Sequence, residues 1–219
     1  SGYEEAASQG LIAGINAARK LQGKEGIVID RSQGYIGVLI DDLVTKESHE
    51  PYRMMTSRAE YRLLLRQDNA DMRLTKIGYE VGLIDEERYQ KLLKKEEMIE
   101  KEIERVEHTN VGTTEAVQAL LESYESTPLT SGTTLAELIR RPELSYEKIA
   151  PIDKHREELP YDVKEQVDIN IKYDGYIKRQ MRQVEQFKKL ENKRIPENIN
   201  YDEIQSLRLE AKQKLNQIR

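Results

Sequence analysis

Residues 85–108 read DEERYQKLLKKEEMIEKEIERVEH, and this stretch indicates the fold class most directly. Its apolar side chains recur every three or four positions, which is the spacing of one face of an α-helix. They are Tyr89, Leu92, Leu93, Ile99, Ile103 and Val106. The remaining positions include nine acidic and six basic residues, which is typical of a solvated helix face rather than a binding site. We therefore predict a long amphipathic helix, capped by Asp85 and the longest in the chain, that ends near His108.

The composition of the whole chain extends this helical prediction. The 219 residues carry a formal net charge of −5, with 37% hydrophobic and 34% charged residues, so a modest core lies under a highly charged surface. With one Phe and no Trp, the core must be built from Leu, Ile, Val, Ala and Tyr, which favours helix packing. The sequence thus predicts a mainly α, multi-helix chain with little or no sheet.

The composition also excludes several kinds of site. Because the chain has no cysteine, it has no disulfide, no thiolate metal site and no cysteine nucleophile. His49, His108 and His155 are too scattered to predict a zinc site or a catalytic triad, and no metal site is expected. The chain has no P-loop and no G-x-G-x-x-G motif. No apolar run is long enough to span a bilayer, so we expect a soluble, cytoplasmic protein without a self-sufficient active site.

Shorter segments complete the helical pattern. Small and apolar residues recur at helical spacing from Tyr3 onwards, and both ends of the chain have the pattern of cut helices. A candidate strand at residues 27–29 precedes a helix over residues 36–44, for which Ser32 is the expected N-cap. Four further helices are predicted: residues 74–83, residues 115–124, residues 135–140 behind Thr134, and residues 176–190. The box Asn200-x-x-Glu203 is expected to start the final helix.

Three regions are expected along the chain. Residues 1–30 carry the first helix, residues 31–150 form a helical domain with an arginine-rich helix, and residues 151–219 form a C-terminal helical subdomain. The second boundary rests on residues 151–160, which have a proline at each end and mixed charge between them. Residues 167–173 fit a strand and a helix equally well, and periodicity does not decide between the two.

The densest functional signal is PYRMMTSRAEYRLLLR at residues 51–66. Ser57-Arg58-Ala59-Glu60 has the form of a capping box, and it predicts a helix that carries Arg58, Arg62 and Arg66 on one face. Guanidinium groups spaced one helical turn apart suit successive phosphates of a nucleic-acid backbone.

Two interpretations of this basic stretch stay open. In the first, it binds nucleic acid, and Tyr52 and Tyr61 supply stacking surfaces for bases. In the second, it is a structural network in which Glu60, Asp68 and Asp71 pair with the arginines. A further basic stretch at residues 172–194, with eight basic and three acidic residues, suits either an acidic partner or a solvated helix face.

Two long stretches resemble a known family. GYEEAASQGLIAGINA at residues 2–17 is similar to the end of a signature of the bacterial tRNA uridine 5-carboxymethylaminomethyl modification enzyme, the GidA/MnmG family. Asp30-Arg31, YIGVLIDDLV at residues 35–44 and residues 51–71 resemble the segment that follows. The similarity resumes with YDGYIKRQ at residues 173–180 and is weaker in between.

The resemblance implies the helical C-terminal region of a flavoprotein that modifies the wobble uridine of certain tRNAs. The family uses FAD, NADH and a folate one-carbon donor, and it works as a homodimer in a complex with a GTPase. Its dinucleotide fingerprint and catalytic cysteines lie upstream of the residues matched here, so no catalytic residue is expected in this chain. The resemblance also favours a helix for residues 167–173.

Three groups of site residues follow from these considerations. The remnant of the flavin site is the helix start at Gly2, Tyr3 and Glu4. The expected tRNA-binding residues are Arg53, Arg58, Arg62 and Arg66. The expected GTPase-docking residues, on polar flanks near the C-terminal end, are Lys178, Arg179, Arg208 and Lys212. Two alternatives stay open: a helical adaptor that docks only a protein partner, and an RNA-binding fragment of unrelated function.

Overall fold

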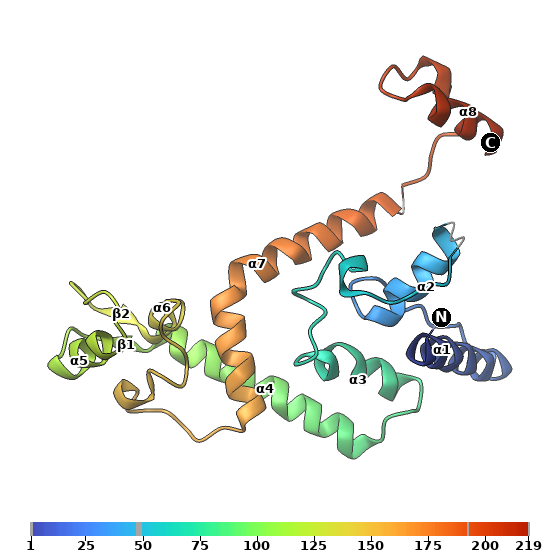
Figure 1. Cartoon of the computed structure of the whole chain (residues 1–219). Helices are drawn as coiled ribbons and strands as arrows, with labels where there is room; N and C mark the ends of the chain where they lie inside the picture. The colour runs from blue at the N-terminus through green and yellow to red at the C-terminus, as the bar shows by residue number, and fades with distance from the viewer. Residues whose placement is uncertain (1, 47–49, 192, 219) are drawn as a thin grey trace. The chain divides into compact units, whose positions relative to one another are not determined.

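The structure, a computed structural model, describes residues 2–46, 50–191 and 193–218 (Figure 1). The chain divides into two compact units, residues 1–180 and residues 181–219. Within the described residues, helices dominate, and the sheet consists of two strands, β1 (Asn110–Val111) and β2 (Thr133–Thr134), paired antiparallel. The predicted mainly α fold with little sheet is confirmed. No helix in the described ranges is both long enough and apolar enough to cross a membrane.

The main apolar core of the first unit gathers buried side chains from four helices and from the loop that carries Leu144, Tyr146 and Ile149. The helices are α4 (Glu86–His108), α5 (Glu115–Ser123), α6 (Leu135–Ile139) and the first part of α7 (Tyr161–Glu191), and Ile152 of the short 3-10 helix η2 (Ala150–Ile152) packs against the core. Val106, Leu121, Leu138 and Val167 are completely buried in it. Because this core takes residues from both sides of position 150, the expected boundary between residues 150 and 151 falls inside the first unit.

Two of the predicted helix starts are confirmed by their capping bonds. Asp85 accepts a hydrogen bond from the backbone N–H of Arg88 at the start of α4. Thr134 accepts one from the N–H of Glu137 at the start of α6. Each bond satisfies an N–H group that the helix leaves without an internal partner.

The helix α7 corrects one expectation and confirms another. It runs without interruption over 31 residues, so it is longer than α4, which has 23, and α4 is not the longest helix. It also includes residues 167–173, which are therefore helical. Val163, Val167 and Ile171 are buried at intervals of four, and this helical spacing places all three in the core.

The segment before α2 (Tyr35–Thr45) differs from the prediction in two places. The candidate strand at residues 27–29 does not form, because the side-chain amide of Asn16 on α1 (Tyr3–Leu21) pairs with both backbone polar groups of Ile27. Ser32 is not the N-cap of α2. Its hydroxyl donates to Asp30 Oδ1 at 2.5 Å, and Gly34 occupies the cap position without a side-chain bond.

The predicted arginine-rich helix at residues 57–66 is wrong. The chain makes one 3-10 turn, η1 (Thr56–Arg58), then irregular turns until α3 (Ala70–Glu80). The cause lies outside the segment. Arg31 Nη2 donates to the carbonyl oxygen of Arg58 at 3.1 Å, so that carbonyl is engaged by a side chain rather than by an amide one turn further on. Arg31 also binds the Glu60 carboxylate, which the capping box would have required.

The second unit contains the end of α7, the 3-10 turn η3 (Tyr201–Glu203) and α8 (Leu209–Ile218). Asn200 caps η3, since its Oδ1 accepts from the N–H of Asp202 at 3.2 Å. The prediction that Asn200-x-x-Glu203 starts the final helix is therefore wrong, because the box closes a single turn and α8 begins at Leu209. Lys212 and Asn216 on α8 donate to Asp202, which holds α8 against η3.

Candidate nucleic-acid interface

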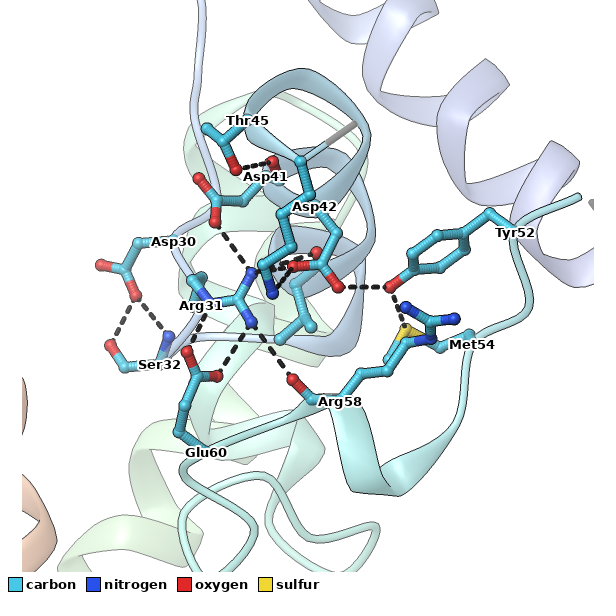
Figure 2. Close-up of polar contacts among 12 residues, drawn as sticks. Asp30, Arg31, Ser32, Asp41, Asp42, Thr45, Tyr52, Met54, Arg58 and Glu60 are labelled. Atoms are coloured by element: carbon cyan, nitrogen blue, oxygen red, sulfur yellow. Dashed lines mark hydrogen bonds and ion pairs between the residues drawn. The ribbon is translucent and has the colours of Figure 1, made fainter. Parts of the chain in front are cut away.

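One half-buried guanidinium, that of Arg31, organises the arginine-bearing segment (Figure 2). Arg31 Nε and Nη2 donate to the two carboxylate oxygens of Glu60, at 2.7 and 3.0 Å. Its Nη1 donates to Asp41 at 2.8 Å and to Asp42 at 2.6 Å, both on α2. The second N–H of Nη2 meets the carbonyl oxygen of Arg58. A guanidinium has five N–H donors, and each of the five here has an oxygen acceptor.

The charges in this cluster stabilise one another. Burial alone would raise the pKa of Asp42, but hydrogen bonds from Lys46, Tyr52 and Arg31 outweigh it and lower this pKa to about 2. Burial would lower the pKa of Arg31, and the bonds to Glu60, Asp42 and Asp41 raise it instead. Asp42 and Arg31 are therefore both charged at neutral pH. The carboxylates of Asp42 and Glu60 bind Arg31 and Lys46 rather than the neighbouring arginines.

Tyr52 links this cluster to Arg58. Its hydroxyl donates to Asp42 Oδ2 at 2.7 Å, and burial together with this bond raises the pKa of Tyr52 to about 12. The guanidinium carbon of Arg58 lies 4.3 Å from the centre of the Tyr52 ring, which is a cation–π distance. Tyr52 and Tyr61 are only 5% and 7% exposed. The prediction that both rings offer stacking surfaces to bases is wrong, because both side chains are buried.

The four predicted tRNA-binding arginines fall into two kinds. Arg53, Arg58 and Arg62 are exposed, and no ion pair between them and a carboxylate is found within the described ranges. Arg66 is half-buried, and it binds both oxygens of Asp68 at 3.1 Å and the carbonyl oxygen of Leu63. The structural alternative therefore holds for Arg66 alone. The other two acids that it invoked bind elsewhere: Glu60 binds Arg31 and Asp71 binds Lys95.

The helix α1 is joined to the arginine segment through Glu5. Its Oε1 accepts the backbone N–H of Met54 at 2.9 Å, and this bond lowers the pKa of Glu5, as does the nearby charge of Arg53. Glu5 Oε2 is buried and has no hydrogen-bond partner in the described structure. A Cβ at Gly2 would meet Glu5 Oε2 and Arg53 Nη1, so both of these side-chain ends lie close to Gly2.

Sequence models of known families match most of the chain. One described as "tRNA modifying enzyme MnmG/GidA C-terminal helical domain" matches residues 86–181, and one described as its "C-terminal helical bundle" matches residues 183–219. A third, "Glucose inhibited division protein A", matches residues 1–25. The chain belongs to the MnmG/GidA family. Within this MnmG/GidA chain, the two C-terminal matches meet where the two compact units meet.

Individual relatives agree with this assignment. The chain is 69% identical, over its whole length, to the tRNA uridine 5-carboxymethylaminomethyl modification enzyme MnmG of Lachnoclostridium phytofermentans, and 63% identical to that of Caldicellulosiruptor saccharolyticus. It spans 35% of the length of each of these relatives. The crystal structure of Aquifex aeolicus GidA (form II) superimposes with a TM-score of 0.77 at 42% identity, over 99% of this chain and 34% of that one.

For the flavin that the MnmG/GidA resemblance implies, the described residues offer a contact only at the start of α1. Gly2, Tyr3 and Glu4 form the first turn of α1, where N–H groups lack helical partners and can donate to an anionic or carbonyl oxygen. The described residues contain no parallel sheet to hold a dinucleotide. They also contain no group of three or more His, Asp and Glu side chains able to hold a metal. The residues present thus fit one contact to a flavin and not a complete site.

The predicted docking residues belong to both units of the MnmG/GidA chain. In the first unit, Lys178 bonds Asp174 at 2.8 Å one turn away on α7, and Arg179 is exposed. In the second unit, Arg208 is exposed, and Lys212 donates to the carbonyl oxygen of Asp202. Lys212 thus has a structural role, whereas Arg179 and Arg208 present their charge to solvent.

Sequence reasoning missed two residues that build this site in the MnmG/GidA chain, Arg31 and Asp42, and it assigned the third, Tyr52, to base stacking instead of to support of Arg58. Asp30-Arg31 and Asp41-Asp42 were present in the matched motif, but nothing local indicates that they meet. One signal was available. Asp42 falls among apolar positions of an amphipathic helix, and a buried carboxylate requires a cation from elsewhere in the chain.

Proposed function

We propose that this chain is the helical region of an enzyme that installs the carboxymethylaminomethyl group on the wobble uridine of tRNA, and that Arg53, Arg58 and Arg62 bind the tRNA backbone. The names of the relatives support the reaction class, and they support it for the whole enzyme, of which the chain matches about a third. The chemistry of the uridine is assigned to residues outside this chain.

The observation that carries the tRNA-binding proposal is the distribution of carboxylates around residues 51–66. Asp41, Asp42 and Glu60 all bind the half-buried Arg31, and Asp68 binds Arg66. Arg58 and Arg62 therefore keep exposed, uncompensated charges on a segment fixed by that same network. Positive groups held apart from protein carboxylates suit a phosphate backbone. Arg66, with its charge compensated, contributes least in this proposal.

The remaining functions are proposed for the whole enzyme. It uses FAD and NADH with a folate one-carbon donor, and Gly2, Tyr3 and Glu4 touch the edge of the flavin. It works in the cytoplasm as a homodimer with a GTPase subunit, which docks on Lys178, Arg179, Arg208 and Lys212. Exposure of Arg179 and Arg208 supports the docking proposal.

The experiment is a tRNA titration of the 219-residue chain at several salt concentrations. Replacing Arg58 and Arg62 by Ala should weaken binding about 10-fold at low salt. It should also reduce the slope of log K against log salt by about 1.5, because two fewer phosphates are neutralised. The matched control replaces Arg88 and Lys94, two exposed cations on α4, by Ala, and it should leave both quantities unchanged.

Three results would contradict the proposal. Equal losses in the α4 control would mean that net charge, rather than this segment, drives binding. Unchanged affinity of the Arg58 and Arg62 variant would favour the adaptor alternative, in which the chain docks only protein. Equal affinity for tRNA and for an unstructured RNA of the same length would favour the generic RNA-binding alternative.

A further inference from the structure

We infer that Arg31 and Tyr52 are positioning residues, which hold the Arg58 guanidinium in place for a tRNA phosphate without touching the RNA themselves. This inference rests on the proposed function, and it adds a mechanism for how one exposed arginine is ordered. Two routes lead from Arg31 to Arg58, one through the backbone and one through Asp42 and Tyr52 (Figure 2).

The backbone route fixes the turn that carries Arg58. Arg31 Nη2 holds the carbonyl oxygen of Arg58 at 3.1 Å, at the end of η1. The same guanidinium donates two hydrogen bonds to the carboxylate of Glu60, two residues further along the chain. The two bonded groups, the Arg58 carbonyl and the Glu60 carboxylate, flank the buried Ala59. Together they fix the direction in which the Arg58 side chain leaves the backbone.

The second route fixes the side chain itself. Arg31 binds Asp42 Oδ1 at 2.6 Å, and Asp42 Oδ2 accepts the Tyr52 hydroxyl at 2.7 Å, which orients the ring. The Arg58 guanidinium lies over this ring at 4.3 Å. The ring holds the cation by its π face, so the N–H groups of Arg58 stay available for an anion.

This arrangement matters because a free arginine side chain loses rotamer freedom when it binds. Ordering the side chain before the encounter reduces that entropic cost, which is the general advantage of a pre-organised binding group. Arg62 provides the comparison within the same segment, because it is exposed and no aromatic ring is found against it in the described structure. Tyr52 itself is buried and cannot reach a base, so its effect on RNA must pass through Arg58.

The test is a double-mutant cycle on tRNA affinity in the 219-residue chain. Tyr52→Leu removes the ring and should weaken binding of tRNA about 2- to 5-fold, the range of an exposed cation–π contact. In a chain that already carries Arg58→Ala, the same change should have no effect. Arg31→Lys keeps the positive charge but loses the planar, forked guanidinium that binds several oxygens at once. It should weaken tRNA binding when Arg58 is present and should have no effect on tRNA binding in a chain that carries Arg58→Ala.

Two further variants separate positioning from general destabilisation. Tyr52→Phe removes only the hydroxyl and keeps the aromatic ring, so it should retain most of the tRNA affinity that Tyr52→Leu loses. Tyr79→Leu is the matched control, because Tyr79 also donates its hydroxyl to a carboxylate, Glu86, and also stacks on another side chain, Tyr89. It should lower the melting temperature without changing the affinity of the folded protein for tRNA.

The outcomes distinguish this inference from the proposed function. Suppose that Arg58→Ala weakens tRNA binding, but that Tyr52→Leu and Arg31→Lys reduce affinity equally in chains with Arg58 and in chains with Arg58→Ala. The positioning inference is then overturned, while the role of Arg58 in tRNA binding stands. If Arg58→Ala leaves affinity unchanged, Arg58 has no role to be positioned for and both statements fail at this residue. If Tyr79→Leu weakens binding as much as Tyr52→Leu, the effect is one of stability, and the inference fails.

Discussion

At the scale of single residues, five arginines close together in the sequence have different roles. Arg31 and Arg66 form ion pairs with carboxylates of the protein itself. Arg53, Arg58 and Arg62 keep theirs exposed. The difference comes from where the acids lie in space, since Glu60 sits between Arg58 and Arg62 in sequence yet binds Arg31. Counting charges along the chain cannot reveal this division of roles.

The Arg31 cluster makes a prediction about pH. The pKa of Asp42 falls from an ordinary 3.8 to about 2 in the folded chain. Its ionised form therefore stabilises the fold above pH 4, and that contribution, about 2 kcal/mol, is lost as the pH falls from about 4 to about 2. Asp42→Asn should lower the free energy of unfolding at pH 7, and the gap between the two proteins should shrink below pH 4.

Denaturant unfolding of both proteins at pH 7 and pH 3 measures this effect. Asp41→Asn is the control, because Asp41 also binds Arg31 but is far more exposed, with 40% of its side chain accessible against 1% for Asp42. Exposed pairs contribute little, so Asp41→Asn should cost much less. A gap between wild type and Asp42→Asn that stays constant from pH 7 to pH 3 would show that the Asp42 charge does not stabilise the fold.

At the scale of elements, the approach of α2 to the preceding segment depends on a glycine. A Cβ at Gly37 would collide with the backbone carbonyl oxygens of Ile29, at 2.5 Å, and of Asp30. Backbone atoms cannot move aside as a flexible side chain can. Gly37→Ala should therefore displace α2, and with it Asp41 and Asp42, and should destabilise the chain by about 2 kcal/mol or more.

Gly10 on α1 is the matched control for this prediction. A Cβ there meets nothing within 4 Å, and Gly10 lies inside a helix, where Ala is favoured by up to about 1 kcal/mol. Gly10→Ala should raise the melting temperature while Gly37→Ala lowers it. If both glycines respond alike, the close packing of α2 against residues 29 and 30 does not control stability.

Elements were predictable from the sequence where their determinants are local. The caps at Asp85 and Thr134 act within one turn, and α4 and α6 begin where they indicate. The Ser57 box failed because Arg31, 27 residues before Arg58, captures the carbonyl and the carboxylate that a helix would have used. The strand at residues 27–29 failed for a similar reason, since a side chain, Asn16, satisfied its backbone groups. Long-range polar contacts thus account for both errors.

The candidate site was predictable only in its exposed part. Basic residues at positions 53–62 are visible in the sequence, and the structure leaves them exposed. The supporting roles of Arg31, Asp42 and Tyr52 were not visible, because these residues come from three separate segments. Their roles follow from contacts that no short pattern encodes.

At the scale of the whole molecule, the division into two units at residues 180 and 181 coincides with the join between the two C-terminal family matches. The first unit holds the apolar core and the Arg31 cluster. Residues 1–25 match the family model that precedes the two C-terminal ones, and these residues supply one helix, α1. A dinucleotide needs a larger surface than one helix start.

We therefore expect the purified 219-residue chain to bind FAD too weakly for it to survive gel filtration. One helix N-terminus offers about 1 kcal/mol of favourable interaction with an anion, far below what micromolar binding requires. Absorbance of the eluted protein measures retained flavin, and a full-length MnmG relative is the positive control. Flavin retained at near-equal molar ratio would mean that this chain holds a site of its own.

The complete engagement of the Arg31 guanidinium has a consequence for chemical labelling. Dicarbonyl reagents condense with guanidinium groups whose nitrogens they can reach. Arg31 has all five N–H groups occupied and 16% of its side chain accessible, whereas Arg58 and Arg62 are open to solvent. The native chain thus contains a protected arginine and reactive ones within about thirty residues of sequence. Arg31 therefore serves as an internal reference, against which protection of Arg58 and Arg62 by a bound polyanion can be read without any substitution.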